Sequence, residues 1–240
     1  MVGATGRSPL LDPTHMKIGL FGGTFDPIHW GHLRSAEEVR EAFRLDRILF
    51  IPASNPPHKK RLPTTTAQQR LAMVGLAIAE NPAFAVSTVE LARPGKSYSI
   101  DTLRHFARRG PRDSLYFILG LDAFRDIGLW KNFQEIFPLC HLIVTSRPGC
   151  GNSLGLGDIP VAARKLFCYD RKKKAYRHKS GKHLYFLKLT DIAISASEIR
   201  ARVRRGKSIR YSVPLEVEEY IKRKRLYRGA GRGGHGFGGN

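Results

Sequence analysis

One short segment, Gly22-Gly23-Thr24-Phe25-Asp26-Pro27-Ile28-His29-Trp30-Gly31-His32, contains the side chains best suited to chemistry. Gly22 and Gly23 allow the backbone to approach a bound phosphate closely. His29 and His32 are three residues apart, so at the start of a helix both rings can project from one side and donate to phosphate oxygens. The segment therefore predicts a phosphate site. A tight turn followed by two surface histidines is the alternative that these residues alone leave open.

The elements around this segment are expected to place it at one edge of a parallel sheet. Lys17–Phe21 is a short apolar run that predicts a buried strand, and apolar residues recur at helical spacing from His32 to Phe43. In an open parallel sheet, ligands bind at such a strand-to-helix turn. The N-terminus of the following helix also offers unpaired N–H groups to an anion.

The alternation of strands and helices continues along the chain. Further expected elements are Arg47–Ile51, Ala67–Glu80, Phe84–Val89, Ser99–Arg108, Leu115–Leu119, Asn132–Phe137, His141–Thr145 and Leu184–Leu189, followed by helices starting at Ser195 and Pro214. The pattern predicts an α/β, Rossmann-like fold with an open, mostly parallel sheet, helices on both faces and a small C-terminal helical part.

One domain with two appendages is the expected organisation. A chain of 240 residues can bury a sizeable core without disulfides. Residues 1–15 precede the first expected strand and are predicted to be an N-terminal extension, which leaves 16–228 as the domain. Residues 229–240 hold seven glycines and are predicted to be a flexible tail.

The charge of the chain predicts an anionic partner. Lys and Arg number 41 against 20 Asp and Glu, a net charge of +21. Of this surplus, +16 lies between Arg164 and Arg232, where 22 Lys or Arg face six acids. Nucleotides, nucleic acid and acidic membrane all fit such a surplus. A solvated helix face and loop is the simpler interpretation of the Lys/Arg run, with RNA binding kept as an accessory possibility.

Cysteine usage and hydropathy indicate an intracellular protein. Cys140, Cys150 and Cys168 are an odd set without a C-x-x-C pair, so neither a disulfide framework nor a cysteine zinc site is indicated. No apolar run reaches the roughly 18 residues that span a bilayer, and residues 1–15 contain no apolar segment of a secretory signal. We therefore expect a cytoplasmic protein without a membrane partner.

The two familiar phosphate loops do not fit this sequence. Gly95-Lys96-Ser97 and Gly206-Lys207-Ser208 end like a P-loop, but the earlier glycine that the motif requires is Glu90 in one case and Ala201 in the other. The dinucleotide fingerprint G-x-G-x-x-G is also missing after the first strand. The phosphate site predicted at residues 22–32 therefore needs another explanation.

Two motifs in the chain resemble those of the nucleotidyltransferases, which transfer a nucleotidyl group from a triphosphate and release pyrophosphate. His29-Trp30-Gly31-His32 resembles their H-x-G-H signature, and Ile194–Arg200, about 160 residues later, resembles their I-S-x-S/T-x-I-R signature. Ser195 and Glu198 by themselves form a capping box that would start any helix. Capping does not explain Arg200, which the resemblance implies adds charge-assisted bonds to ATP phosphates.

The middle of the chain is similar to the bacterial nicotinate-nucleotide adenylyltransferases. Pro56-Pro57-His58-Lys59 resembles their P-P-H-K loop, and Ser97–Leu103 resembles their S-Y-T-x-x-T-L segment with Ser99 in place of threonine. Leu119–Phe124, Trp130 and Ser146–Gly149 follow in the family's order. The likeness covers residues 16–227; the extension, the tail and the basic stretch Arg171–Lys182 depart from it.

The resemblance implies a reaction and a set of residues for it. The implied reaction transfers the adenylyl group of ATP to nicotinate mononucleotide, giving nicotinate adenine dinucleotide and pyrophosphate in NAD biosynthesis, with Mg²⁺ accompanying ATP and no protein ligand of the metal assigned. The implied residues are His29, His32 and Arg200 for catalysis; Gly22, Gly23, Thr24, Phe25, Gly120, Asp122, Ser195 and Ser197 for ATP; and Lys59, Ser97, Tyr98, Ser99, Trp130 and Arg147 for the pyridine nucleotide. Trp130 is expected to stack on the pyridine ring.

Other functions stay open at this point. An adenylyltransferase acting on nicotinamide mononucleotide or phosphopantetheine would share the same phosphate chemistry, and the P-P-H-K and Ser97-Tyr98-Ser99 segments favour the carboxylated pyridine nucleotide over both. A basic RNA-binding protein is the alternative from a different class, motivated by the charged last third and a Gly-Arg tail. Neither the motifs nor the charge distribution indicates an oligomeric state.

Overall fold

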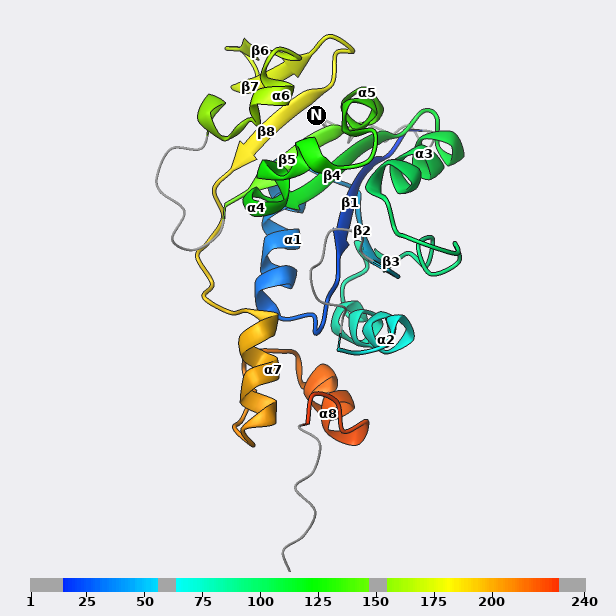
Figure 1. Cartoon of the computed structure of the whole chain (residues 1–240), viewed down its shortest axis with the longest axis vertical. Helices are drawn as coiled ribbons and strands as arrows, with labels where there is room; N and C mark the ends of the chain where they lie inside the picture. Colours follow the sequence, from blue (N-terminus) through cyan, green and yellow to red (C-terminus); the bar gives the residue numbers. More distant parts are fainter. Residues whose placement is uncertain (1–14, 56–63, 147–154, 229–240) are drawn as a thin grey trace, which may run out of the picture.

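An eight-stranded sheet forms the centre of the molecule in this computed structural model, which describes residues 15–55, 64–146 and 155–228 (Figure 1). Its strands are β1 (Lys17–Gly23), β2 (Arg47–Pro52), β3 (Phe84–Val86), β4 (Ser114–Gly120), β5 (His141–Thr145), β6 (Phe167–Asp170), β7 (Ala175–His178) and β8 (His183–Leu187). They are ordered β3-β2-β1-β4-β5-β8-β7-β6. Strand β1 is central and pairs in parallel with both β2 and β4, with Leu20 opposite Leu49 and Phe117. The carboxyl ends of these three strands therefore meet at one edge.

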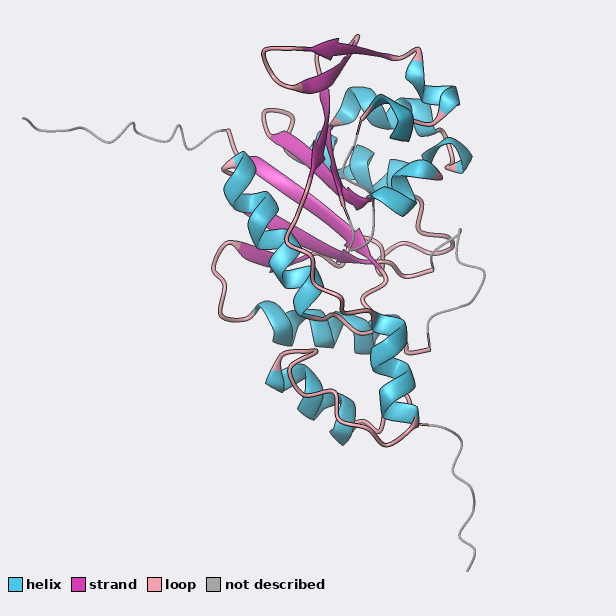
Figure 2. Ribbon diagram, turned by 90° about the vertical axis from the view of Figure 1, so that its left-hand side faces the viewer, coloured by secondary structure: helices cyan, strands magenta, loops and turns pink. Residues whose placement is uncertain are grey.

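Helices lie on both sides of the sheet (Figure 2). They are α1 (Trp30–Phe43), α2 (Ala67–Ile78), α3 (Ser99–Arg109), α4 (Leu121–Arg125), α5 (Ile136–Leu139), α6 (Val161–Arg164), α7 (Ala196–Arg204) and α8 (Leu215–Arg223), with short 3-10 turns η1 (Ile127–Leu129), η2 (Phe133–Glu135) and η3 (Leu156–Asp158). Residues of α1, α2, α7 and α8 share one buried apolar cluster, and residues of α3, α4, α5 and α6 share another. The expected open, mostly parallel sheet covered on both faces is confirmed.

Several expected boundaries shift by a few residues. Helix α1 begins at Trp30 rather than His32, because His29 already serves as its N-cap residue. Helix α2 ends at Ile78, short of Glu80, and β3 stops at Val86, short of Val89. The segment expected at Asn132–Phe137 is a 3-10 turn followed by one short helix, and the last expected strand runs from His183 to Leu187.

Strands β6 and β7 were not anticipated. They pair antiparallel, and β7 pairs antiparallel with β8, which itself runs parallel to β5. Their apolar positions alternate over only four residues each and are separated by the basic run at Arg171, so no strand pattern stands out. One part of the Lys/Arg run lies on this hairpin and its turns, and another part lies on α7 and α8, as the expected helix face does.

The first loop, residues 24–29, joins β1 to α1. The C-terminal helices α7 and α8 form the layer below the sheet edge that carries this loop (Figure 1). Ser195 is the N-cap residue of α7 and Pro214 that of α8, which confirms both expected starts. Helix α8 packs against α2. Within the described residues, no helix combines the length and apolarity that crossing a bilayer demands.

Candidate active site

The two histidines lie together at the beginning of α1. His29 occupies the N-cap position and His32 the third helical residue, and their ring centroids are 3.7 Å apart with planes inclined by 32°. The backbone N–H of His29 donates to Nδ1 of His32 over 3.3 Å. When this ring is neutral, its proton is consequently on Nε2, which points a donor away from the helix backbone. His29 is 7% exposed and His32 is half-buried.

Two glycines make room for aromatic rings in this loop. A Cβ at Gly31 would lie 3.1 Å from Cε1 and Nδ1 of the His29 ring, and a Cβ at Gly23 would lie 2.7 Å from the Phe25 ring. Contacts this close force the neighbour to move. Both glycines thus permit side chains to fold back over the backbone, a role separate from that of approaching a phosphate.

Phe25 packs its ring against the ring of His32. Its side chain is 2% exposed and its backbone adopts a left-handed conformation with φ of 50°. Its ring lies 5.1 Å from the His32 ring in an edge-to-face arrangement and also packs on Phe21 and Phe50. The Phe25 side chain therefore belongs to the core, and only its backbone is available to a nucleotide.

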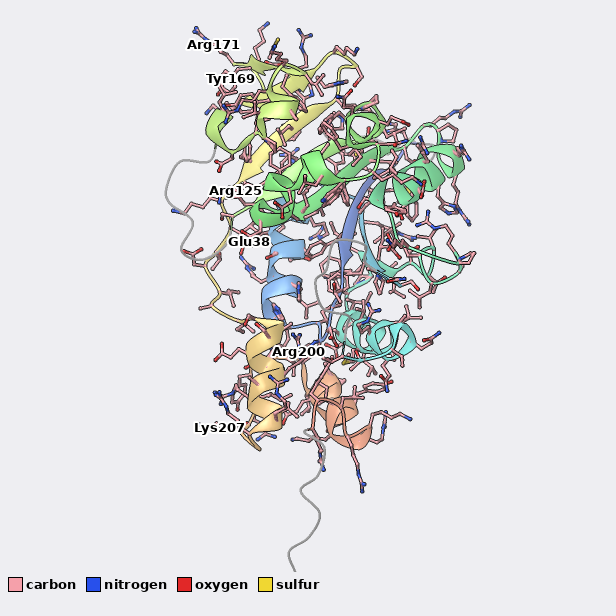
Figure 3. The ribbon with its side chains drawn as sticks, viewed as in Figure 1. Glu38, Arg125, Tyr169, Arg171, Arg200 and Lys207 are labelled. Atoms are coloured by element: carbon pink, nitrogen blue, oxygen red, sulfur yellow. The ribbon has the colours of Figure 1, made fainter. Side chains whose placement is uncertain are left out.

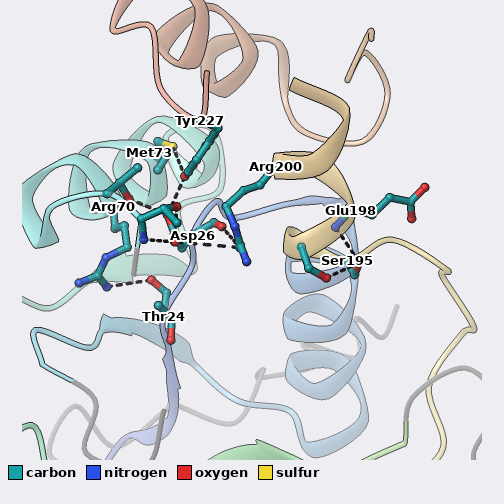
Figure 4. Close-up of polar contacts among 11 residues, drawn as sticks. Thr24, Asp26, Arg70, Met73, Ser195, Glu198, Arg200 and Tyr227 are labelled. Atoms are coloured by element: carbon teal, nitrogen blue, oxygen red, sulfur yellow. Dashed lines mark hydrogen bonds and ion pairs between the residues drawn. The ribbon is translucent and has the colours of Figure 1, made fainter. Parts of the chain in front are cut away.

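Asp26, in the same loop, is a buried carboxylate that accepts hydrogen bonds from two other segments, residues 64–65 and residue 227 (Figure 4). Its Oδ1 accepts from Thr65 Oγ1 at 2.6 Å and from the Tyr227 hydroxyl at 2.8 Å. Its Oδ2 accepts from the N–H and hydroxyl of Thr64 at 2.8 and 2.9 Å. The carboxylate thereby links the first loop to the start of α2 and to the residues after α8.

The hydrogen bonds to Asp26 decide its charge. Burial raises the pKa of this carboxyl, but the bonds from Thr65, Thr64 and Tyr227 outweigh burial and hold the pKa below its ordinary value. Burial, followed by the nearby Asp26 charge, raises the pKa of the Tyr227 phenol, so the phenol stays protonated and donates. Asp26 is an ionised acceptor at neutral pH.

Arg200 reaches the same loop from α7. Its Nη1 donates to the backbone carbonyl of Asp26 over 2.5 Å and lies 4.0 Å from the Asp26 carboxylate (Figure 4). The second signature motif is thus folded directly against the first. A guanidinium has five N–H donors, and this contact uses a donor of Nη1 only. The other N–H groups can donate to an anion.

A second buried arginine holds the first two loops together. Arg70 on α2 is 1% exposed; its Nη1 donates to the carbonyl of Thr24 at 2.8 Å and its Nη2 to that of Ser54 at 3.2 Å. Burial lowers the pKa of this guanidinium and the charge of Asp26 opposes the shift. The buried Arg70 side chain therefore links the loop after β1 to the loop after β2 through hydrogen bonds to one carbonyl in each.

The two serines at the start of α7 are exposed. Ser195 Oγ accepts from the N–H of Glu198 at 3.2 Å and lies 3.1 Å from Ser197 Oγ. This is one half of the expected capping box. The carbonyl of Ile194 lies 3.8 Å from where a Gly31 Cβ would be, so the start of α7 adjoins the start of α1.

Residues expected to hold the pyridine nucleotide gather at the neighbouring loops. Ser97 Oγ accepts from the N–H groups of Ser54 and Asn55 at 3.1 and 3.2 Å, which ties this segment to the end of β2. Tyr98 occupies the N-cap position of α3, which begins at Ser99, and Lys131 Nζ lies 4.6 Å from the centroid of the Tyr98 ring. Since Lys131 directly follows Trp130, the structure brings these two distant parts of the sequence together.

The remaining expected residues divide into those the structure describes and those it does not. Gly120 ends β4 beside β1, and the exposed Asp122 follows in the first turn of α4. Lys59 and Arg147 lie outside the described residues. Among residues 15–55, 64–146 and 155–228, no group of three or more His, Cys, Asp or Glu side chains could hold a metal ion.

The comparisons with known proteins agree with this geometry. The model of the cytidylyltransferase-like family matches residues 20–202. A curated protein of Syntrophotalea carbinolica named "probable nicotinate-nucleotide adenylyltransferase" is 51% identical over 89% of this chain and 98% of its own length. One of the same name from Geotalea uraniireducens is 49% identical over 90% of this chain and 100% of its own. The chain belongs to the nicotinate-nucleotide adenylyltransferase family.

A solved structure shares the fold of this family member. The nicotinic acid mononucleotide adenylyltransferase of Plasmodium falciparum, complexed with NaAD, superposes with a TM-score of 0.68 at 19% identity over 89% of this chain and 98% of its own. At that identity the likeness shows the fold. As a member of its family, the chain is a nucleotidyltransferase.

The sequence alone did not reveal the buried residues that fix the loop between β1 and α1. Asp26 stands inside the motif segment but received no role, although a carboxylate among Phe, Pro and Ile is a signal of a buried acceptor. Arg70 lies in the helix expected at Ala67–Glu80 and Thr65 just before it, and neither belongs to a motif. Tyr227, 201 residues from its partner, left no local signal.

Proposed function

We propose that this chain transfers the adenylyl group of ATP to nicotinate mononucleotide, forming nicotinate adenine dinucleotide and pyrophosphate. The observation that supports it most is the pair of adjoining imidazoles, 3.7 Å apart, at the N-terminus of α1, directly beyond strand β1. Donors at a helix N-terminus suit the phosphates of a nucleotide. Membership of the family supplies the choice of substrates.

The proposed chemistry is a direct displacement at phosphorus. An oxygen of the 5′-phosphate of nicotinate mononucleotide attacks the α-phosphorus of ATP, the new O–P bond forms, and the bond from the α-phosphorus to the bridging oxygen breaks. The electron pair leaves with pyrophosphate. Positioning and charge stabilisation can supply most of the acceleration of such a transfer, so no covalent enzyme intermediate is required.

The loop after β1 and the start of α7 would hold the triphosphate. His32 would donate from Nε2 to the phosphate oxygens as charge builds on the leaving group, with His29 beside it and the remaining donors of Arg200 assisting. The backbone of residues 22–25 would line the nucleotide, since the Phe25 side chain is buried. Ser195, Ser197, Gly120 and Asp122 complete the proposed ATP set.

The neighbouring loops would hold the pyridine nucleotide. The segment Ser97–Ser99 would face the nicotinate carboxylate with the N–H groups of Tyr98 and Ser99, because the N–H of Ser97 donates to the carbonyl of Asn55 over 2.9 Å. Trp130 would stack on the ring. The cation of Lys131 beside Tyr98 makes this corner electrostatically suited to an acid. Lys59 and Arg147 stay in the proposed set as predictions, as does the division into residues 1–15, 16–228 and 229–240.

Mg²⁺ enters the proposal with ATP. The described residues offer no three-ligand cage for a metal, so they do not fit an ion held by the protein alone. Mg²⁺ commonly binds nucleotide phosphates with few protein ligands, and this is the form in which we expect it here. We further propose that the reaction takes place in the cytoplasm, where ATP is available.

Two substitutions at His32 test the phosphate role. Removing a donor aimed at developing charge costs on the order of 10²–10³ in rate, so His32→Ala is expected to lose most turnover in a pyrophosphate-release assay. His32→Asn keeps an acceptor near the position of Nδ1 for the His29 N–H but lacks Nε2. It is expected to retain the stability of the fold while losing turnover as fully as His32→Ala.

His105→Ala is the matched control, because His105 is exposed on α3 and away from the first loop. Its turnover is expected to equal that of the unchanged protein. Near-normal pyrophosphate release by either His32 variant would refute the role assigned to this side chain.

A substrate panel tests the reaction itself. Pyrophosphate release is measured with ATP and Mg²⁺ plus, in turn, nicotinate mononucleotide, nicotinamide mononucleotide and phosphopantetheine. The acid is expected to give the highest kcat/KM. Preference for the amide or for phosphopantetheine would overturn the substrate assignment and leave adenylyl transfer in place.

A further inference from the structure

A strongly basic hairpin lies at the sheet edge away from the first loop. The basic hairpin, residues 164–183, contains β6, β7 and the turns around them. Its nine cations are Arg164, Lys165, Arg171, Lys172, Lys173, Lys174, Arg177, Lys179 and Lys182, and its one acid is Asp170. All of the nine except Lys182 are exposed. The proposed adenylyl transfer uses none of these residues.

The single acid does not neutralise this surface. Asp170 Oδ1 accepts the backbone N–H groups of Lys172 and Lys173 at 3.0 and 3.2 Å, and its Oδ2 lies 3.4 Å from His183 Nε2. Within the described part of the chain, no carboxylate pairs with any of the nine cations. A concentrated, uncompensated charge of this kind favours binding to a polyanion.

An aromatic platform stands within the cations. Tyr169 on β6 faces Tyr176 on β7 in the ladder, and their rings are 5.2 Å apart. Tyr169 is 57% exposed and Arg171 lies beside it at the end of the molecule, far from Arg200 (Figure 3). An exposed ring next to cations is the arrangement on which proteins stack the bases of single strands.

The other occupants fit this surface less well. Pairing of two β6 edges in a dimer would bring two groups of like charges together, which opposes association. A surface helix or loop that enters a membrane needs exposed apolar side chains, and within the basic hairpin Tyr169 is the only large exposed hydrophobic residue. Charge and aromatic exposure together favour a nucleic acid.

We propose that the basic hairpin binds single-stranded RNA, with its cations on the phosphates and Tyr169 stacked on a base. The site is separate from the one that would hold ATP, because β6 is the edge strand five places from β1. Binding would be salt-dependent and would tolerate different sequences, since phosphates and base faces are common to all RNA.

Fluorescence anisotropy of a labelled single-stranded oligouridine with the full chain tests this proposal at rising salt. Neutralising three cations in Arg171→Gln/Lys172→Gln/Lys173→Gln is expected to reduce the slope of log affinity against log salt by about 2. Lys174 is left unchanged because its φ is 48°. The triple variant is expected to keep its pyrophosphate release.

Arg108→Gln/Arg109→Gln/Arg112→Gln is the matched control, with the same loss of charge at three exposed arginines around the end of α3. Its slope and affinity are expected to match those of the unchanged protein. An equal loss in both triple variants would assign the binding to net charge and overturn the proposal. So would failure of the unchanged protein to bind oligouridine at low salt.

Tyr169 separates stacking from charge. Tyr169→Ala is expected to weaken binding about fivefold or more at every salt concentration without changing the slope, whereas Tyr169→Phe keeps the affinity. Annealing the oligouridine to its complement is expected to weaken binding because the bases are then covered. Equal affinity for duplex, or stronger binding to phosphatidylserine vesicles than to the oligouridine, would contradict a single-stranded RNA site.

Discussion

The hydroxyl of Tyr227 donates to Oδ1 of Asp26 over 2.8 Å and so joins two residues that are 201 positions apart in the chain. Asp26 precedes the proposed catalytic histidines by three and six residues. Its carboxylate is also held by Thr64 and Thr65, and its carbonyl by Arg200. The loop that carries the histidines is therefore held by residues 64–65 and by two residues near the C-terminal end of the domain.

Tyr227→Phe removes one donor from a buried carboxylate and adds none. Hydrogen bonds to charged groups contribute about 1.5–3 kcal/mol, so the variant is expected to unfold with a free energy lower by roughly that amount in urea titrations. Tyr220→Phe on α8 is the control, because no hydroxyl hydrogen bond of Tyr220 appears within the described residues. Equal destabilisation by both changes would contradict the role of the Asp26 contact.

The effect of Tyr227→Phe is expected to depend on pH. The folded pKa of Asp26 lies below its ordinary value, 3.8, so its contribution to stability is present above that value and is lost as the pH falls through the lowered pKa. The stability difference between the unchanged protein and Tyr227→Phe should therefore shrink at acidic pH. A difference that stays constant down to the lowest pH at which both fold would show that the charge of Asp26 is not involved.

Gly31→Ala tests the close approach between the His29 ring and the backbone. The added Cβ would stand 3.1 Å from two ring atoms, so the ring must shift and we expect pyrophosphate release to fall while the fold remains. Gly75→Ala, in the middle of α2 with nothing within 4 Å, is the matched control. It is expected to stabilise the protein by about 0.5–1 kcal/mol and to leave turnover unchanged.

Trp130→Ala tests stacking on the pyridine ring. Loss of the ring is expected to raise KM for nicotinate mononucleotide while leaving KM for ATP near its original value, as steady-state assays with each substrate varied would show. Leu129→Ala, at the adjacent and 78% exposed residue, should change neither constant. A parallel rise in both KM values after Trp130→Ala would indicate a structural role instead.

Glu90, which lies beside Thr102 of α3, allows a second test of how stability depends on pH. Burial raises the pKa of this carboxyl, whose Oε1 accepts from Thr102 Oγ1 at 2.8 Å. A raised folded pKa makes the protein less stable as the pH rises from the ordinary value, 4.5, through the raised one. Glu90→Gln should thus gain stability relative to the unchanged protein at neutral pH and lose that gain near pH 4.5. A gain of the same size at both pH values, or one shared by Glu41→Gln on the exposed face of α1, would count against it.

Local patterns predicted the parts of the fold that local forces determine. The run from Lys17 to Phe21, the glycine turn and the helical spacing after His32 are all contained in one short segment, and the structure has β1, the loop and α1 there. The starts at Ser195 and Pro214 were equally accessible because capping depends on a few neighbouring residues. The family was accessible because its motifs are short and ordered.

The remaining features depend on contacts between distant residues. Nothing near Tyr227 indicates that its hydroxyl meets Asp26, and nothing near Arg70 indicates that its guanidinium bonds two carbonyls in different loops. The basic hairpin escaped prediction because each strand has only four residues and the charges between them resemble a loop. The roles of the individual site residues stay predictions.

The bond between Asp26 and Tyr227 also has a consequence for how the protein is made. Translation proceeds from the N-terminus, so the histidine loop leaves the ribosome early and waits for most of the chain to follow. Its last hydrogen-bond donor arrives only when residue 227 has emerged. A nascent chain can therefore form strands β1 and β2 before the loop with the histidines has all of its hydrogen bonds. The loop is complete only after α8 and residue 227 have been synthesised.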